Sequence, residues 1–434
     1  MPDEPRIVSE DIAGEADRPG AVPLLRRFRL DTRPLRQSPD FRNLWLGQAV
    51  SSFGNAITTV AMPFQVYELT HSTLWVGLLA LAGLVPLLVV PLVGGAVADA
   101  FDRRKIALVS TVALAGVSGC LVANAALAQP RVWPIFVLEA VGTAAWGFAR
   151  PAMMTLAPKL VPDDQLEAAM ALEGIYSNFA SVAGPALGGV LIAAIGLSAS
   201  YGIDVATFSA SLIALWSLPA SPAQGETDRV SLAAIRDGLR FVGRTPELMG
   251  IFLVDTNAMI FGMPSALFPA LAVHYGGGAR TVGVLYAAPY AGAFLASLAS
   301  GFTGHVRRQG LAVCVAAGIW GLAIAGVGAV DVLWPALALL AVAGGADYIS
   351  AVLRSTILVR VTPDEMRGRM FGVELAQVAG APSLGNLEAG VVASLTSVRT
   401  SIASGGILCA VGTVVVALAL PAFVRYDARR ARAA

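Results

Sequence analysis

The stretch NLWLGQAVSSFGNAITTVAMPFQVY, residues 43–67, carries no charged residue across 25 positions. A helix needs about 20 mostly apolar residues to cross the hydrocarbon core of a bilayer. A core helix of a soluble protein does not need so long a run without charged residues. This stretch therefore predicts a membrane-spanning helix.

Eleven further apolar stretches follow, separated by short and mostly basic loops. With the first they cover residues 43–67, 73–98, 106–129, 132–158, 168–196, 199–218, 248–275, 281–304, 311–330, 333–359, 370–395 and 400–423. These runs are long and continuously apolar, whereas the strands of a membrane β-barrel alternate over about ten residues. The composition agrees, with 56% hydrophobic and 14% charged residues and a mean hydropathy of +0.70. The predicted fold is an all-α integral membrane protein with 12 transmembrane helices.

The basic residues indicate the orientation of these helices. With the N-terminus inside, 25 of the 30 lysines and arginines fall in cytoplasmic segments, and only Arg131, Arg280 and Arg399 face outward. Positively charged loops remain on the cytoplasmic side of a membrane. We therefore expect a multi-pass protein of the cytoplasmic membrane with both termini in the cytoplasm.

Residues 1–40 are polar and mixed in charge, and they end in a basic run without the apolar core of a signal peptide. We expect a disordered cytoplasmic tail that touches anionic lipid and enforces the topology, in preference to a regulatory docking segment. Cys120, Cys314 and Cys409 stand alone in three spans, so they indicate packing and predict no metal site or disulfide.

An internal repeat relates the two halves of the chain. The matches keep one order, and their offset drifts in one direction from 207 to 197 residues. They pair Ser38-Pro39-Asp40 with Thr245-Pro246-Glu247, Val76-Gly77 with Val282-Gly283, Gly95 with Gly301, Arg103-Arg104 with Arg307-Arg308, Trp133-Pro134 with Trp334-Pro335, Pro162-Asp163-Asp164 with Pro363-Asp364-Glu365, Glu173 with Glu374, and Pro185 and Gly188 with Pro382 and Gly385.

Such a duplication predicts two pseudo-symmetric six-helix bundles, residues 41–218 and 248–423, around a cavity. A cytoplasmic loop over residues 219–247 would join them, and residues 424–434 would form a basic tail. Rocking of one bundle against the other would open the cavity to each side in turn. The alternative is a duplicated bundle without transport.

The loop after the second span runs Gly95-Ala-Val-Ala-Asp99-Ala-Phe-Asp102-Arg103-Arg104-Lys105. It resembles the signature loop between spans 2 and 3 of the major facilitator superfamily, although Ala100 and Asp102 depart from the family pattern. The resemblance implies that Gly95 allows close helix packing and that Asp99, with Arg103, Arg104 and Lys105 beside it, latches the two halves through the start of span 11. The alternative is a solvated loop acid next to three residues that obey the positive-inside rule.

The fifth span contains Gly184, Pro185, Gly188 and Gly189, which are similar to a motif of exporters and antiporters in this superfamily. Proline and glycine here predict a bend that flexes or seals, and packing alone is the alternative. Phe41-Arg42, the turn over residues 69–78 and the run over residues 285–288 resemble the enterobactin exporter branch. That branch implies a siderophore or a similar natural product as cargo, but it also includes multidrug exporters.

Ionisable residues inside the spans are candidate proton carriers, because a charge in the bilayer costs several kcal/mol unless it is paired, hydrated or neutralised. Asp255, about eight residues into its span, is the first choice. Glu139 stands where many antiporters of the superfamily have an arginine, and Arg150 shares its helix face. For each acid, pairing with a polar neighbour is the alternative to ion coupling.

The second half contains further candidates. Asp347 and Arg354 share one face of span 10, and Glu388 in span 11 is a weaker candidate. Asp204 in span 6 ranks equally low, because its place near the start of the span suggests the outer interface.

These observations favour a proton-driven exporter of an amphipathic small molecule that works by alternating access. A nutrient importer or facilitator is the alternative within transport, and a membrane sensor or enzyme is the alternative outside it. We expect no enzymatic activity, because the sequence contains no pair of nucleophile and base, no metal cluster and no phosphate-binding loop. The expected protein is a monomer in the lipid bilayer that uses the proton gradient, with no cofactor, no metal and no nucleic-acid partner.

Overall fold

The computed structural model describes residues 31–221 and 232–427, without the side chains of residues 91–100, 232–235, 300, 302 and 304. Its first half contains α2 (Arg33–Gln37), α3 (Pro39–Thr70), α4 (Thr73–Ala100), α5 (Arg103–Ala125), α6 (Val132–Leu156), η1 (Ala157–Leu160), η2 (Asp163–Gln165) and α7 (Leu166–Ser217). After α8 (Leu232–Arg244), its second half contains α9 (Pro246–Phe261), η3 (Ser265–Leu267), α10 (Phe268–His274), α11 (Ala279–Leu298), η4 (Ser300–His305), α12 (Gln309–Ala329), α13 (Leu333–Val361), α14 (Asp364–Leu395), α15 (Val398–Ala419) and α16 (Pro421–Val424).

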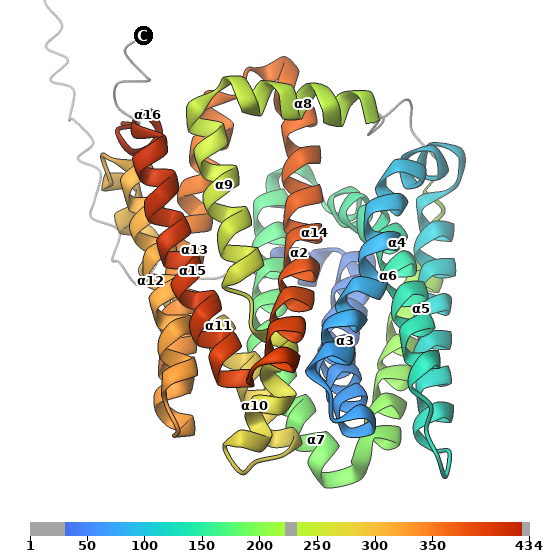
Figure 1. Ribbon diagram of the computed structural model, residues 1–434. Helices are drawn as coiled ribbons and strands as arrows, with labels where there is room; N and C mark the ends of the chain where they lie inside the picture. The colour runs from blue at the N-terminus through green and yellow to red at the C-terminus, as the bar shows by residue number, and fades with distance from the viewer. Residues whose placement is uncertain (1–30, 222–231, 428–434) are drawn as a thin grey trace, which may run out of the picture.

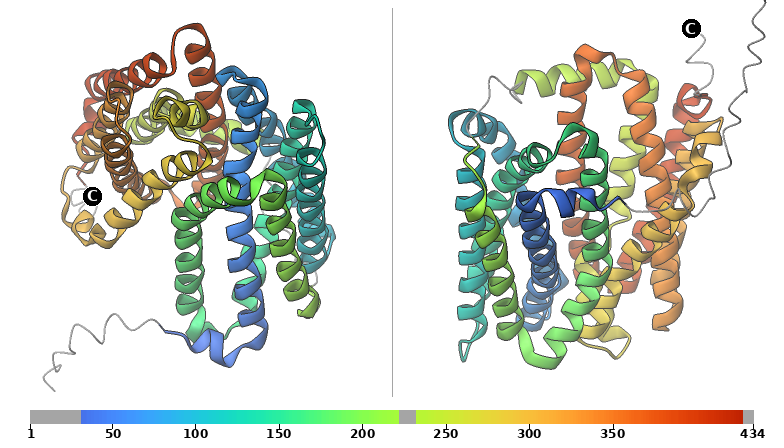
Figure 2. Two further views of the ribbon diagram at one scale, coloured as in Figure 1. Left: turned by 90° about the horizontal axis from the view of Figure 1, so that it is seen from below. Right: turned by 180° about the vertical axis from the view of Figure 1, so that it is seen from behind.

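The helices run side by side between two ends of the molecule (Figure 1). The basic end holds α8 and α16, and the turn end holds α10 and the reversal in α7. That reversal occurs at Gly196, whose φ of 80° and ψ of 172° interrupt the helix. Because this φ is one that residues with a side chain rarely adopt, glycine is needed there. The element thus comprises two antiparallel helices (Figure 2).

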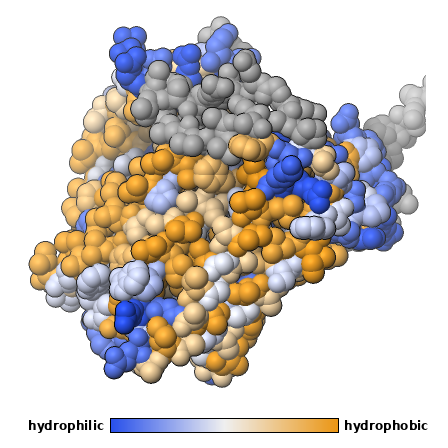
Figure 3. Space-filling model, turned by 90° about the vertical axis from the view of Figure 1, so that its right-hand side faces the viewer, coloured by the Kyte–Doolittle hydropathy of each residue, from blue (hydrophilic) through white to orange (hydrophobic). Residues whose placement is uncertain are grey.

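The surface of the bundle is that of a membrane protein. Large apolar side chains are exposed along the helices, and Ile213 and Leu418 have 72% and 78% of their surface accessible. Apolar residues cover the middle of one flank, and polar residues gather towards its edges (Figure 3). Exposure on this scale needs lipid around it.

Each of the twelve predicted stretches overlaps a helical segment, with α7 serving two of them. Among the described residues, nine helices are long and apolar enough to cross a membrane, and the hairpin α7 is one of these. The helices α3 and α14 are not among the nine, so the count of twelve crossings stays a prediction. The predicted all-α membrane fold is confirmed.

Two predicted segments differ from the structure. The stretch 248–275 is broken after Phe261, because Pro264 has no N–H for a helical hydrogen bond. The tail expected to be disordered over residues 1–40 contains α2 and the start of α3, where the Ser38 side chain caps the helix by accepting a hydrogen bond from the Phe41 N–H. Residues 1–30 lie outside the described part of the chain.

Two large contacts join the N half (α3–α7) to the C half (α9–α15): α4 packs against α14, and α7 packs against α11. A Cβ placed on Gly77 would lie 2.8 Å from the carbonyl oxygen of Asn386, and one on Gly283 would lie 2.5 Å from that of Pro185. The internal repeat pairs Gly77 with Gly283. The two contacts are therefore equivalent under the repeat, as pseudo-twofold symmetry requires.

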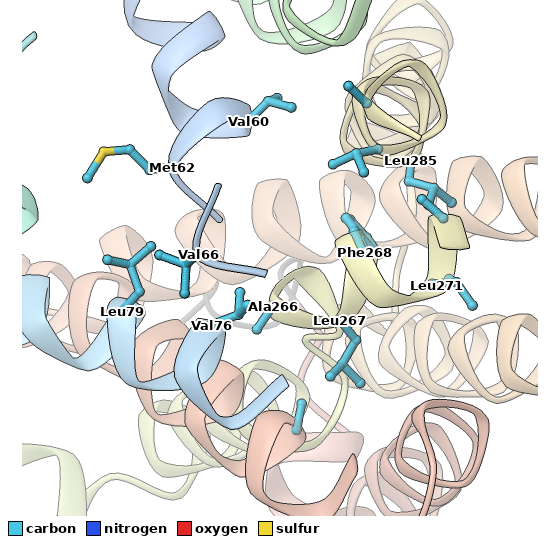
Figure 4. Packing of buried hydrophobic residues seen from close by; sticks show 14 of the residues in the cluster. Val60, Met62, Val66, Val76, Leu79, Ala266, Leu267, Phe268, Leu271 and Leu285 are labelled. Carbon is cyan, nitrogen blue, oxygen red and sulfur yellow. The ribbon is translucent and has the colours of Figure 1, made fainter. Parts of the chain in front are cut away.

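Buried apolar residues form three clusters. The shared core lies at the turn end and draws on both halves, with Val66 and Val76 beside Ala266 (Figure 4). At the basic end the N half has a cluster of its own around Phe41, and the C half has another around Phe423. The halves are thus sealed together at the turn end and have separate cores at the basic end.

Candidate substrate cavity and buried charges

A cavity of about 430 Å³ lies between the halves, on the side of the shared core that faces the basic end. The N half supplies most of its wall, including Asn55, Glu139, Trp146 and Asp204. Apolar side chains predominate, and a few amides, hydroxyls and carboxylates interrupt them. This mixture is typical of a site for a small amphipathic molecule.

A second cavity of about 520 Å³ continues the first towards the basic end. The two share Asn55, Leu114, Trp146 and Phe208 in their walls. Residues near the start of α3 and α7 and the end of α6 line the second cavity. A path therefore leads from the middle of the bundle towards the basic end, while the shared core closes the turn end.

The break between α9 and α10 forms the C-half side of the deeper cavity. Ser265 Oγ and the Ala266 N–H both donate to Asn386 Oδ1, at 2.7 and 2.8 Å, and the Tyr286 hydroxyl donates to the Ser265 carbonyl at 2.9 Å. These bonds satisfy backbone groups that the broken helix leaves unpaired. Irregular backbone at membrane depth is tolerated where it lines a cavity.

Asp204 is buried in the wall of the same cavity, with only 1% of its surface exposed. Its Oδ2 accepts hydrogen bonds from Thr58 Oγ1 of α3 at 2.6 Å and from Ser118 Oγ of α5 at 2.7 Å. Thr207 Oγ1 lies 3.4 Å from its Oδ1. Three helices thus meet at one carboxylate, and no lysine, arginine or histidine is among its described contacts.

Glu139 lines the cavity from α6 and accepts a hydrogen bond from Thr143 Oγ1 at 3.2 Å. Arg150, predicted to share its face, lines the second cavity, where its guanidinium lies 5.0 Å from the centre of the Trp146 ring. That distance is within the range of a cation–π interaction. Among the described contacts no ion pair joins Glu139 to Arg150.

Asp255, the first-choice carrier, forms an ion pair with Arg354. Its Oδ1 lies 2.7 Å from a guanidinium nitrogen, and the two side chains are only 7% and 12% exposed. The contact is ionic without a well-directed hydrogen bond, since Asp255 Oδ1 accepts none. Arg354 also lies 3.8 Å from Asp347 and donates to Ser350 Oγ at 2.9 Å. This cluster joins α9 to α13.

The remaining predicted site residues lie elsewhere. Glu388 is partly buried on α14, and it is not among the lining residues of the two cavities. The backbone of Gly95 and Asp99 belongs to α4, but their side chains lie outside the described residues, so the predicted latch is untested.

The basic residues after that loop begin α5. Asp102 caps this helix by accepting hydrogen bonds from the backbone of Arg104 and Lys105. The Arg103 N–H donates to the Ser221 carbonyl, and the Arg104 guanidinium donates to the Leu215 carbonyl at 2.9 Å. The loop is therefore tied to the end of α7 within the N half.

The glycines of the exporter-like motif pack in two directions. A Cβ on Gly188 would lie 3.1 Å from the Cα of Ile57 in α3, and Gly184 packs against Ala56 of the same helix. A Cβ on Gly189 would instead lie 2.8 Å from the Cα of Gly283, across the junction between the halves. One face of the motif thus packs within the N half, and the other packs against the C half at the turn end.

A protein-family model described as "Transmembrane secretion effector", a family of the major facilitator superfamily, matches residues 31–432. The chain belongs to this family. As a member it is a multi-pass membrane protein and a secondary transporter, and the resemblance drawn from the loop over residues 95–105 is confirmed.

Relatives of this family member include enterobactin exporters. The exporter of Citrobacter koseri is 32% identical over 387 residues, which cover 88% of this chain and 92% of the relative. That of Salmonella typhimurium is 30% identical and covers 87% and 92%.

Solved structures share the fold. A nucleoside transporter superposes with a TM-score of 0.74 at 11% identity over 88% of this chain and 99% of its own. A bacterial homologue of the human lysosomal transporter Spinster, inward-facing and unoccupied, gives a TM-score of 0.69 at 14% identity over 92% and 100%. At these identities the likeness supports the major facilitator fold alone.

Asp204 and Asn386 are the cavity residues whose importance the sequence understated. The predicted span 6 begins at residue 199, whereas the second helix of α7 begins directly after Gly196. Asp204 thus lies eight residues along this helix, about 12 Å at 1.5 Å per residue. That depth equals the one inferred for Asp255, and a start of the span at the glycine would have revealed it.

Proposed function

We propose that this transporter exports a siderophore-like or drug-like amphipathic molecule in exchange for protons. Both termini and the basic end lie in the cytoplasm, so the cavity faces the cytoplasm in this conformation. Cargo enters from inside, the halves rock, and the seal at the turn end opens outward. We prefer this function to the alternatives of an importer, a facilitator or a membrane sensor.

The observation that carries the proposal is a cavity between two halves whose large described packing contacts and shared core lie at the turn end, while each half has a core of its own at the basic end. A transporter that closes one end at a time has a core of its own in each half and a detachable contact between them. The shared core at the turn end is that contact. The enterobactin exporters among the relatives support the direction and the class of cargo.

The partners of this transporter are the small-molecule cargo and the lipid bilayer, and it works as a monomer without nucleic acid. Energy comes from the proton gradient, with no cofactor, metal or enzymatic step. Coupling needs a carboxylate that the cavity reaches, and of the acids predicted from sequence, Glu139 and Asp204 meet that condition.

The direction of transport can be measured in membrane vesicles. In everted vesicles, whose cytoplasmic face is outside, an acidic lumen should drive accumulation of radiolabelled enterobactin. A protonophore should abolish that accumulation, and vesicles that lack the protein supply the background. Accumulation only in right-side-out vesicles would instead identify an importer, and uptake that ignores the gradient would identify a facilitator.

A further inference from the structure

The negative charges of two buried carboxylates, Asp255 and Asp204, are stabilised in different ways. Asp255 has a cation, Arg354, at 2.7 Å. In the described part of the chain, the side-chain partners of Asp204 are hydroxyl groups, those of Thr58, Ser118 and Thr207. Hydroxyls stabilise a carboxylate by hydrogen bonds but leave its net charge in a low-dielectric interior.

The two environments predict different responses to protons. Protonation of Asp255 would leave the Arg354 charge buried without its partner, so the ion pair resists it. Protonation of Asp204 removes an uncompensated charge. Its hydroxyl partners can also accept hydrogen bonds, so a protonated Asp204 can donate to Thr58 or Ser118. The site thus accommodates both protonation states without rearrangement of the helices.

The position of Asp204 links it to the cargo. Thr58, Ser118 and Asp204 all line the cavity, with Glu139 as the other carboxylate in that wall. Gly54 of α3 leaves room for Asp204, since a Cβ there would collide with Asp204 Oδ1 and Thr207 Oγ1. Among the described residues, Tyr201 of α7 is a further titratable group near Asp204, and its hydroxyl donates to Gln65 Oε1 of α3 at 2.9 Å.

We propose that the junction of Asp204 with Thr58 and Ser118 is the proton-binding site of the N half. This inference rests on the proposed exchange of cargo for protons and names the group that carries the proton. One proton from outside binds the carboxylate when the cavity faces outward. The same proton leaves to the cytoplasm when the cavity faces inward, and no other bond changes.

The decisive variant is Asp204→Asn, which keeps the size and hydrogen bonds of the side chain but cannot titrate. Infrared difference spectra of the purified protein between alkaline and mildly acidic pH should contain a protonated-carboxyl band that this variant lacks. Asp255→Asn is the matched control and should keep the band. In Ser118→Ala, which removes one stabilising donor, the band should persist to more alkaline pH. An unchanged band in Asp204→Asn would overturn the assignment.

Proteoliposomes separate this inference from the proposed function. With enterobactin as the probe, Asp204→Asn should lose accumulation driven by a proton gradient but retain exchange of internal for external enterobactin. Exchange moves no net proton, so a purely structural role of Asp204 would impair both processes. If the wild-type protein moves no enterobactin, the proposed cargo fails while the infrared result still decides the proton site. Driven accumulation that survives in Asp204→Asn would refute the site.

Discussion

A leucine at Gly189 should strongly reduce export while leaving the protein folded. A Cβ at this position would already lie 2.5 Å from the Ala279 carbonyl oxygen and 2.8 Å from the Gly283 Cα. Overpacking of a tight contact costs about 1–3 kcal/mol. Since the contact exists only while the turn end is sealed, we expect the variant to shift the population towards the state that is open to the outside.

At 1.4 kcal/mol per factor of ten, transport should fall by about tenfold to a hundredfold. A cysteine at Ser265, which lines the cavity on the cytoplasmic side of the shared core, reports the conformation in a background without Cys120, Cys314 and Cys409. In Gly189→Leu it should react with a membrane-impermeant maleimide from outside, whereas in the parent it should not.

The control is Gly202→Leu on the same element, because a Cβ there has no neighbour within 4 Å. It should transport and label like the parent. If Gly189→Leu transports normally, the close contact at the turn end has no part in the cycle.

Replacement of Arg354 by methionine should strongly destabilise the protein. The guanidinium pairs with Asp255 at 2.7 Å in a site where both side chains are almost fully buried. Removal of one partner from a buried ion pair costs about 3–5 kcal/mol, because the other charge remains without compensation. Asp347 lies 3.8 Å from the same guanidinium, and its side chain is 46% exposed, so its charge depends less on Arg354 for compensation.

Thermal unfolding in detergent measures this effect. The melting temperature of Arg354→Met should fall by many degrees, and the double variant Arg354→Met, Asp255→Asn should regain most of the loss. Arg236→Met, on an exposed side chain of α8, is the matched control and should change little. Equal losses in the single and double variants would mean that the arginine acts through packing alone.

Much of the fold was predictable from the sequence because a bilayer leaves few choices. The long apolar stretches predicted the all-α membrane fold, and the match of Gly77 with Gly283 in the internal repeat relates two equivalent contacts of the structure. The break after Phe261 could have been read from Gly262 and Pro264. Apolar length alone predicts a continuous helix there.

The candidate site was harder to predict because its contacts join different helices. Shared helix faces suggested that Glu139 accompanies Arg150, but in the structure Arg150 lies over Trp146 instead. Nothing in the spacing of Asp255 and Arg354, on α9 and α13, reveals that they meet. The hydroxyl partners of Asp204 likewise come from α3 and α5, and serines and threonines in spans are too common to single out.

In the proposed cycle the shared core comes apart once per turnover, which limits how strong it can be. Each square ångström of apolar surface sealed there is wetted again when the cavity faces outward, at about 25 cal/mol. Where the helices cross, Gly77, Gly189, Gly283 and Gly390 meet backbone to backbone and bury little side-chain surface. We therefore expect the close fit of these helices, and not a large buried apolar area, to keep protons from leaking through the turn end. A more strongly bound shared core would slow turnover before it reduced that leakage.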